Sequence, residues 1–304
     1  MLLTCAIFAS GCSRSVSLPE QSIQEISIDK EAVTVSFLGP EGTYTQEACG
    51  VFFEKMGTYI PYETVGDAVD ALEEGLTDYA VIPQENTIGG AVTDYVDIVI
   101  AKSSLSVIGE VELPINQNLL VMPGTSLNDI KTVYSHKQGI AQGKEWLEKN
   151  LPDAEVIEVS STAEGAKMIS EAKDTSCAAI ASAACADVYG LDILATAIQE
   201  NDSNKTRFYV LSTQPPVSST LDRLGFIAAG NAEDLTALMS EMEKLGMKLV
   251  TIHDRPLKSE LGEYCYIIEC FECSYRDYEK LVDKSRMDLR FLGCFNVVTP
   301  DDYH

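Results

Sequence analysis

The sequence predicts an α/β protein of two lobes, followed by a smaller tail of strands and helices. After Glu31, short apolar runs alternate with amphipathic helical segments, which is the pattern of an α/β architecture. The chain crosses between two such groups twice, near residues 107–122 and again before residues 208–211. Beyond a proline-containing segment the predicted order becomes βαββαβ, which indicates a ferredoxin-like sandwich.

The first lobe is predicted from residue 33 onward. Residues 33–38 form an apolar strand that Gly39-Pro40 ends, and residues 79–83 form a second strand. Helices are expected at 45–56, 64–74 and 92–100, the first with Ala48, Phe52 and Met56 on one face. Strands at 107–113 and 118–122 carry the chain into the second lobe.

The second lobe spans about residues 115–190. Strands are expected at 132–134, 154–159 and 177–180, with helices at 140–149, 162–170 and 182–189. The chain then returns through the apolar residues 208–211. Two lobes joined by two crossings predict a cleft between them, with functional loops at the strand ends.

Residues 31–213 are therefore predicted to form a two-lobed domain, residues 214–221 a linker and residues 222–304 the tail. Pro215-Pro216 and the surrounding hydroxyl residues indicate an extended, exposed connection. The tail strands are expected at 224–229, 248–252, 264–269 and 289–295, and its helices at 233–245 and 276–285. In the third strand Tyr264, Tyr266 and Ile268 alternate with Cys265, Ile267 and Glu269. This alternation predicts a sheet face that a second copy covers, and hence at least a dimer.

Composition excludes several classes of function. The net charge of −25 leaves no basic stripe for nucleic acid. An anionic ligand would meet overall repulsion, so we expect local cations, and Lys205 and Arg207 are the candidates. Three histidines without ligand-like spacing predict that the protein binds no metal. Of the nine cysteines only Cys270 and Cys273 lie close together, and strand alternation would place them on opposite faces, which argues against a redox pair.

The first thirty residues have two interpretations. Residues 1–11 are apolar or small, Cys12 follows Ser10-Gly11, and residues 13–30 look like a disordered tether. This resembles a bacterial lipoprotein signal with Cys12 as the lipidated residue, which implies a lipid anchor and an extracytoplasmic location. However, no lysine or arginine precedes the apolar run. The alternative is a mis-assigned start or a disordered tail on a cytoplasmic protein.

The segment most suited to chemistry is Asn204-Lys205-Thr206-Arg207-Phe208. Arg207 is the only arginine between Lys30 and Arg223. Arginine can grip a planar carboxylate with two parallel hydrogen bonds, and Thr206 offers a hydroxyl donor beside it. The apolar strand that follows would hold these side chains at a fixed strand end. The alternative is an ordinary transition from loop to strand with one surface arginine.

Other polar clusters follow predicted strands. Residues 39–44 form a glycine-containing turn that opens a helix, whose first N–H groups could meet an anion. Glu85, Asn86 and Thr87 follow the second strand, although Asn86 or Thr87 could simply cap the next helix. Residues 135–142 repeat the arrangement in the second lobe. Residues 161–164 match a capping box, which is a structural feature.

Together these segments resemble the prephenate dehydratase family, in order and over roughly residues 33–295. The resemblance implies a catalytic domain similar to type II periplasmic binding proteins, a C-terminal ACT regulatory domain and a dimer or tetramer. It also implies the conversion of prephenate to phenylpyruvate in L-phenylalanine biosynthesis, a hydro-lyase reaction without a cofactor. Thr206 would be the catalytic donor, while Arg207 would either hold a carboxylate or brace the site. The substrate-binding residues implied are Thr43, Glu85, Asn86, Thr87, Ser135, Gln142, Arg207 and Phe208.

The resemblance also implies a site for L-phenylalanine as effector in the tail. Its candidate residues are Asn231, Leu235, His253, Asp254, Arg255 and Pro256. Here His253-Asp254-Arg255-Pro256 stands where the family usually has Glu-Ser-Arg-Pro. Glu233 and Asp234 would repel the carboxylate of the effector, so we expect weak or altered feedback. Two other functions fit the sequence: arogenate dehydratase, and a membrane-tethered solute-binding protein of the same two-lobed fold.

Overall fold

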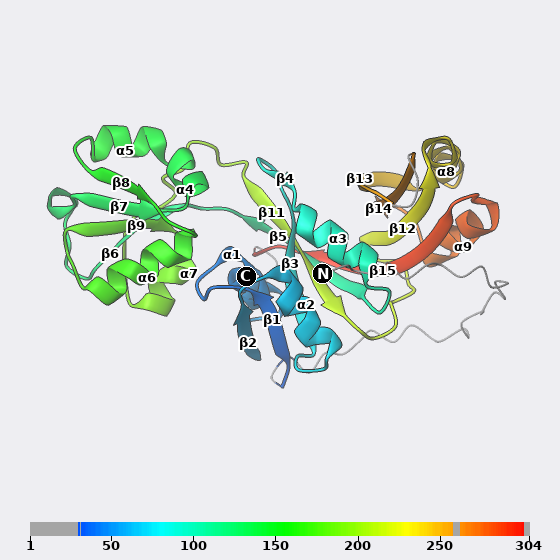
Figure 1. Ribbon diagram of the computed structural model, residues 1–304, viewed down its shortest axis with the longest axis horizontal. Coiled ribbons are helices and arrows are strands. Elements are labelled where there is room, and N and C mark those ends of the chain that lie inside the picture. The colour runs from blue at the N-terminus through cyan, green and yellow to red at the C-terminus, as the bar shows by residue number, and fades with distance from the viewer. Residues whose placement is uncertain (1–29, 31, 258–261, 301–304) are drawn as a thin grey trace.

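The computed structural model describes residues 30, 32–257 and 262–300, apart from the side chains of residues 93 and 94. Figure 1 shows three parts in a row, with the first lobe between the second lobe and the tail. This is the predicted α/β fold with two lobes and a βαββαβ tail. Cys12 and the predicted tether lie outside the described residues. No helix of the described ranges is both long and apolar enough to cross a membrane.

The first lobe is a mixed sheet covered by helices. Its strands run in the order β5-β11-β3-β1-β2, and β4 pairs with β3. Thr43 and Thr64 cap the first two helices by accepting backbone N–H groups of Gln46 and Asp67. The elements are β1 (Thr34–Leu38), α1 (Tyr44–Phe52), β2 (Thr58–Tyr62), α2 (Val65–Glu73), β3 (Tyr79–Asn86), β4 (Gly90–Ala91), α3 (Thr93–Ala101), β5 (Ser106–Pro114) and β11 (Lys205–Ser212).

The second lobe is a separate five-stranded sheet in the order β10-β6-β9-β7-β8. Its core is built from small and branched apolar residues, with β9 buried along its whole length. The elements are β6 (Asn118–Val121), η1 (Leu127–Asp129), β7 (Thr132–Ser135), α4 (Lys137–Gln142), α5 (Lys144–Asn150), β8 (Glu155–Glu158), α6 (Thr162–Ala172), β9 (Cys177–Ala181), α7 (Ala183–Tyr189) and β10 (Asp192–Ala195).

The tail sheet is continuous with the sheet of the first lobe. Its strands pair antiparallel in the order β13-β14-β12-β15, and the end of β15 pairs in parallel with β5. Gly293 allows this passage, because its φ is +147° and a Cβ there would lie 2.3 Å from the carbonyl oxygen of Val107. The elements are β12 (Arg223–Asn231), α8 (Ala232–Lys244), β13 (Lys248–Pro256), β14 (Glu263–Phe271), α9 (Tyr275–Lys284) and β15 (Asp288–Val298).

Both faces of strand β14 in the tail sheet are covered by the chain itself. Tyr266 and Ile268 pack among residues of α8 and α9, in one apolar cluster. Cys265 and Ile267 point the other way and pack with Tyr95 and other residues of the first lobe. The alternation along β14 therefore gives no argument for a second copy, because the first lobe occupies the face that we expected a partner to cover.

Several local predictions differ from the structure. The edge strands β2 and β10 were missed, since they are short and none of their residues is fully buried. The single helix predicted at 140–149 is two helices, α4 and α5, that meet at Gly143. Strand β3 extends to Asn86 and β11 begins at Lys205. Polar residues that we expected in loops thus lie inside paired strands, where alternation fixes the side on which each points.

The prediction that Cys270 and Cys273 point to opposite faces is wrong. Strand β14 ends at Phe271, and Glu272 has a left-handed φ of +53°, so the alternation stops before Cys273 is reached. The two sulfur atoms lie 3.5 Å apart in the tail core. A pair of adjacent thiols is therefore present where the sequence pattern argued against one.

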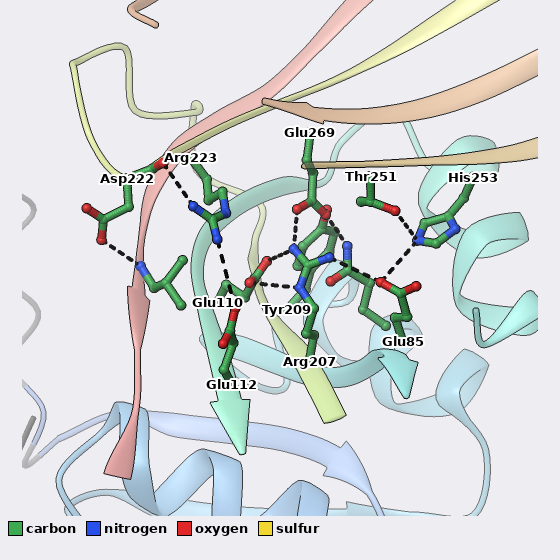
Figure 2. A network of polar contacts seen from close by, with 12 residues as sticks. Glu85, Glu110, Glu112, Arg207, Tyr209, Asp222, Arg223, Thr251, His253 and Glu269 are labelled. Carbon is green, nitrogen blue, oxygen red and sulfur yellow. Dashed lines mark hydrogen bonds and ion pairs between the residues drawn. The ribbon is translucent and has the colours of Figure 1, made fainter. Parts of the chain in front are cut away.

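Arg207 lies at the centre of a buried ion cluster that joins the first lobe to the tail (Figure 2). Its Nε donates to Oε1 of Glu110 at 2.9 Å, and its Nη2 donates to Oε2 at 2.5 Å. Its guanidinium also contacts Glu85 of β3 and Glu269 of the tail strand β14. Glu110 and Glu269 are completely buried. In this arrangement the guanidinium of Arg207 is engaged by carboxylates of both the first lobe and the tail.

Three carboxylates surround this single guanidinium, so the cluster carries excess negative charge. Glu269 also accepts hydrogen bonds from Gln84 and from the hydroxyl of Tyr209. Burial, followed by repulsion from Glu269, raises the pKa of Glu110 to about 7 despite the attraction of Arg207. Glu110 therefore holds a proton in the folded protein at pH values where an unfolded glutamate is ionised.

This proton gives a testable dependence of stability on pH. Between pH 4.5 and about 7 the folded state binds more protons at Glu110 than the unfolded state does, so Glu110 makes stability fall as the pH rises. The effect is at most about 3 kcal/mol across that window. Glu110→Gln cannot ionise, and the free energy of unfolding of this variant in urea should fall less between about pH 5 and 7.

Glu112→Gln is the matched control, because Glu112 lies on the same strand, is partly exposed and is 4.0 Å from the Nζ of Lys205. This variant keeps Glu110, so the fall in stability that Glu110 causes between about pH 5 and 7 should remain. Equal slopes for wild type and Glu110→Gln would show that Glu110 is already ionised in the folded state.

Candidate active site

A cavity of about 320 Å³ lies between the two lobes. The first lobe and the two crossings provide Leu38, Gly39, Thr43, Tyr44, Thr45, Asn86, Ile115, Gln117, Asn204 and Thr206, and the second lobe provides His136, Gln138, Gly139, Gln142, Ser160, Ser161 and Thr162. A larger hollow of about 560 Å³ lies along the end of α8, but half of its lining residues are three methionines and a leucine, and its only polar side chains are those of Ser240, Glu243 and Lys248. The cavity between the lobes brings together far more hydrogen-bonding groups.

Thr206 lines this cavity, and its hydroxyl is oriented by Asn86. Nδ2 of Asn86 donates to Oγ1 of Thr206 at 2.9 Å and also contacts Oδ1 of Asn204 at 2.9 Å. Oδ1 of Asn86 in turn accepts the backbone N–H groups of Ile88 and Gly89, which fixes the amide. Because Oγ1 of Thr206 already accepts a hydrogen bond from Asn86, its own proton is free to be donated into the cavity.

Two further amides line the cavity and were missed in the sequence. Nδ2 of Asn204 and Oε1 of Gln117 are buried without a hydrogen-bond partner in the described structure. Both residues are almost completely buried, and a buried polar group without a partner is unfavourable. Asn204 belongs to the segment that contains Thr206, so its position was visible in the sequence. Gln117 lies in a crossing segment, where no pattern singled it out.

The cavity contains no lysine or arginine among its lining residues. Instead, the first turns of α1 and α6 meet it from opposite lobes, with Thr43 and Ser161 as their N-caps. The N–H groups of a first helical turn lack intrahelical partners and favour negative charge. His136, the N-cap of α4, is the one lining residue that could become cationic.

The two lobes are also held together beside the cavity. In the second lobe, Ser182 donates to the carbonyl oxygen of Gly42 at 2.7 Å, and Tyr189 donates to that of Glu41 at 2.8 Å. Gly42 has a φ of +80°, and a Cβ there would lie 2.8 Å from the sulfur of Cys185. Glycine is thus required where the turn of the first lobe packs on α7.

Burial also keeps one lining hydroxyl protonated. Burial, followed by repulsion from Glu47, raises the pKa of Tyr44 well above its usual value, and its hydroxyl donates to the carbonyl oxygen of Asn116.

In the described ranges, no group of three or more histidine, cysteine or acidic residues could hold a metal ion. The chemistry that this lining can perform is hydrogen bonding to an anion and to a departing oxygen.

The structure brings together only part of the residue set expected from the sequence. Thr43, Asn86, Gln142 and Thr206 line the cavity. Ser135 is buried and donates to the carbonyl oxygen of Ile180, while Phe208 lies in the apolar core of the first lobe. The hydroxyl of Thr87 donates to Oδ1 of Asn204, so Thr87 contacts a lining residue without lining the cavity itself. Glu85 and Arg207 lie in the ion cluster described above, and Lys205 is exposed.

The expected effector residues lie in the tail at two places. Asn231 caps α8 by accepting the N–H of Asp234, and Leu235 packs against the tail core. The other four residues end strand β13, where Nη2 of Arg255 donates to Asp97 of α3 at 2.8 Å. His253 lies 3.9 Å from Glu85, at the edge of the ion cluster (Figure 2). The end of β13 therefore packs against the first lobe.

Comparison with known proteins identifies the family. The sequence model described as "Prephenate dehydratase" matches residues 35–216. A bifunctional chorismate mutase/prephenate dehydratase of Neisseria gonorrhoeae is 35% identical over 83% of this chain and 72% of its own. The prephenate dehydratase of Bacillus subtilis is 30% identical over 86% of this chain and 95% of its own.

A solved structure agrees with these sequence comparisons. Prephenate dehydratase from Arthrobacter aurescens, in complex with L-Phe, is 29% identical, covers 87% of this chain and 90% of its own, and superposes with a TM-score of 0.75. The family match covers more than half of the sequence, and the Bacillus relative is matched over nearly its whole length. This chain therefore belongs to the prephenate dehydratase family.

Proposed function

We propose that the chain converts prephenate to phenylpyruvate in the cavity between the lobes, as a hydro-lyase of L-phenylalanine biosynthesis. The observation that carries the proposal is that Thr206 lines the cavity and that its hydroxyl oxygen accepts a hydrogen bond from Asn86. Membership of the family supplies the reaction. The geometry supports the roles that we propose for individual residues.

The reaction removes the ring carboxylate as CO2 and the ring hydroxyl as hydroxide, and the ring becomes aromatic. Formation of the aromatic ring thus provides the thermodynamic driving force. The protein must position a dianion and stabilise charge on the departing oxygen. A threonine is too weak an acid to release its proton fully, so Thr206 acts by hydrogen bonding to the developing charge. Asn86 is a positioning residue, since it orients the hydroxyl.

The two carboxylates of the substrate are held by neutral donors in this proposal. The first turns of α1 and α6 approach the cavity from opposite lobes, so one carboxylate can meet each helix start. The unpartnered Nδ2 of Asn204 supplies a further donor. The cations that we expected to recruit the dianion, Lys205 and Arg207, are not part of the cavity.

The lining favours prephenate over arogenate. Arogenate carries an ammonium group where prephenate carries a keto oxygen, and a buried ammonium requires a carboxylate or several acceptors. The cavity lining contains no aspartate or glutamate, and Oε1 of Gln117 is its one buried acceptor without a partner. The measurement that separates the two is the ratio of kcat/KM for the two substrates. A solute-binding protein of this fold would turn over neither.

Thr206→Val should fold normally and lose most of its turnover, because it keeps the β-branched shape and removes only the hydroxyl. Loss of one positioned donor to developing charge lowers kcat by about 10²–10³. The measurement is kcat at saturating prephenate, with melting temperatures matched to wild type. A kcat within about threefold of wild type would exclude Thr206 as the catalytic donor.

Two companion variants sharpen this experiment. Asn86→Asp keeps an oxygen for the N–H groups of Ile88 and Gly89 but replaces the amide that donates to Thr206 with an acceptor. The hydroxyl proton would then turn toward Asp, and kcat should fall even though Thr206 is intact. Thr87→Val removes a hydroxyl that contacts Asn204 outside the cavity lining, and its effect on kcat should be much smaller.

We further propose that the tail is an effector domain that responds weakly to L-phenylalanine. A relative was solved in complex with L-Phe. The resemblance to the family implies an effector site in the tail that includes Asn231 and Leu235, at the start of α8. In this chain Glu233 and Asp234 lie in the first turn of α8, and Asn231 already binds both the N–H and the carboxylate of Asp234. The start of the helix therefore offers an amino acid carboxylate repulsion and few free donors.

Initial rates with increasing L-phenylalanine test this proposal. We expect little inhibition below millimolar effector, and stronger inhibition in the double variant Glu233→Gln/Asp234→Asn, which removes the two charges. Strong inhibition of the wild type at micromolar effector would show that these carboxylates do not weaken binding.

A further inference from the structure

The tail domain contains two buried cysteines whose sulfur atoms are in contact. Cys270 lies near the end of β14, and Cys273 precedes the start of α9. The left-handed conformation of Glu272, with a φ of +53°, turns the chain between them. This turn brings the Sγ atoms to 3.5 Å from each other. The turn thus holds the two sulfur atoms in contact, and both residues are buried in the tail core.

The surrounding structure leaves Cys270 one partner within reach. Leu224 of β12 pairs with Cys270 on one side and with Cys294 of β15 on the other, so a whole strand separates these two cysteines. Two strand spacings amount to roughly 9–10 Å, which is beyond the reach of a disulfide. Cys265 lies on the opposite face of β14. The other described cysteines, Cys49, Cys177 and Cys185, belong to the two lobes.

Cys273 has the properties of the attacking thiol. Its hydrogen-bonding contact with Cys270 lowers its pKa, whereas the same contact and burial raise the pKa of Cys270. It also retains 8% of its surface, while Cys270 retains none. A thiolate is the reactive form of cysteine, so the outer member of the pair is the more reactive one.

We propose that Cys270 and Cys273 are a site of reversible oxidation, with hydrogen peroxide as the oxidant. The thiolate of Cys273 attacks one peroxide oxygen, the O–O bond breaks, and a sulfenic acid forms as hydroxide leaves and takes up a proton. The sulfur of Cys270 then attacks that of Cys273, and its proton leaves with the departing oxygen as water. In sum, two thiols and one peroxide give one disulfide and two waters.

The geometry allows this product with a small movement. The sulfur atoms must approach from 3.5 Å to about 2.05 Å, and the two residues are already joined by a tight turn. The preceding residue, Glu269, is the tail carboxylate that contacts Arg207. Along the chain the modified site is therefore one residue from the ion cluster that joins the tail to the first lobe, with its thiols on the opposite face of β14.

The experiment uses the full-length protein, reduced and then freed of reductant. Samples are treated with increasing hydrogen peroxide, denatured, alkylated and mapped by mass spectrometry. The expected result is a peptide that contains both Cys270 and Cys273, lacks both alkyl groups and has lost two hydrogen atoms. Treatment with dithiothreitol should restore alkylation of both residues. The mapping needs no variant, so it does not depend on the folding of a mutant.

Two variants identify the partner. Cys294→Ser, in the same core, should form the same disulfide, whereas Cys273→Ser should leave Cys270 alkylated after peroxide treatment. The proposal is overturned if both cysteines of the wild type remain alkylated at peroxide concentrations that oxidise glutathione. It is also overturned if either one pairs with another cysteine or is oxidised only to sulfinic acid.

Discussion

The ion cluster around Arg207 is the interaction on which the arrangement of the parts depends. One guanidinium contacts carboxylates of β3, β5 and the tail strand β14, and two of these carboxylates are completely buried. Removal of one partner from a buried pair typically costs about 3–5 kcal/mol, because it leaves a charge without compensation. Together with the pairing of β15 and β5, the cluster makes the tail a continuation of the first lobe, rather than a domain on a flexible linker.

Strand β11 serves the site and the cluster at the same time. Thr206 and Arg207 are consecutive, so the alternation of a strand directs one side chain into the cavity and the other toward the tail. A shift of β11 that repacks Arg207 must also move Thr206. This is the physical route by which the state of the tail can affect the chemistry, through Glu269 as its direct contact. The cavity itself stays free of fixed cations, which fits recognition of a dianion by helix starts and amides.

The sequence predicted the fold well because apolar periodicity reports burial. It failed at the edge strands β2 and β10, whose side chains are partly exposed. For the site, the segment around Thr206 was singled out in the sequence and does line the cavity between the lobes. The contacts of Arg207, however, are with Glu110 and Glu269, which are 97 and 62 residues away. No local pattern reveals such partners. Ser135 and Phe208 look like site residues in the sequence, but their side chains are buried. The left-handed turn at Glu272 likewise had no sequence signal.

The most direct test of the bracing role is Arg207→Lys, with KM for prephenate and the free energy of unfolding measured on the same preparation. Lysine keeps the charge but cannot contact three carboxylates through a planar fork. If Arg207 braces the fold, the free energy of unfolding should fall by about 2–4 kcal/mol while KM stays within about threefold of wild type. The opposite result is an unchanged free energy of unfolding with KM raised tenfold or more, which is a loss of about 1.4 kcal/mol of binding free energy. That result would show that Arg207 holds the substrate.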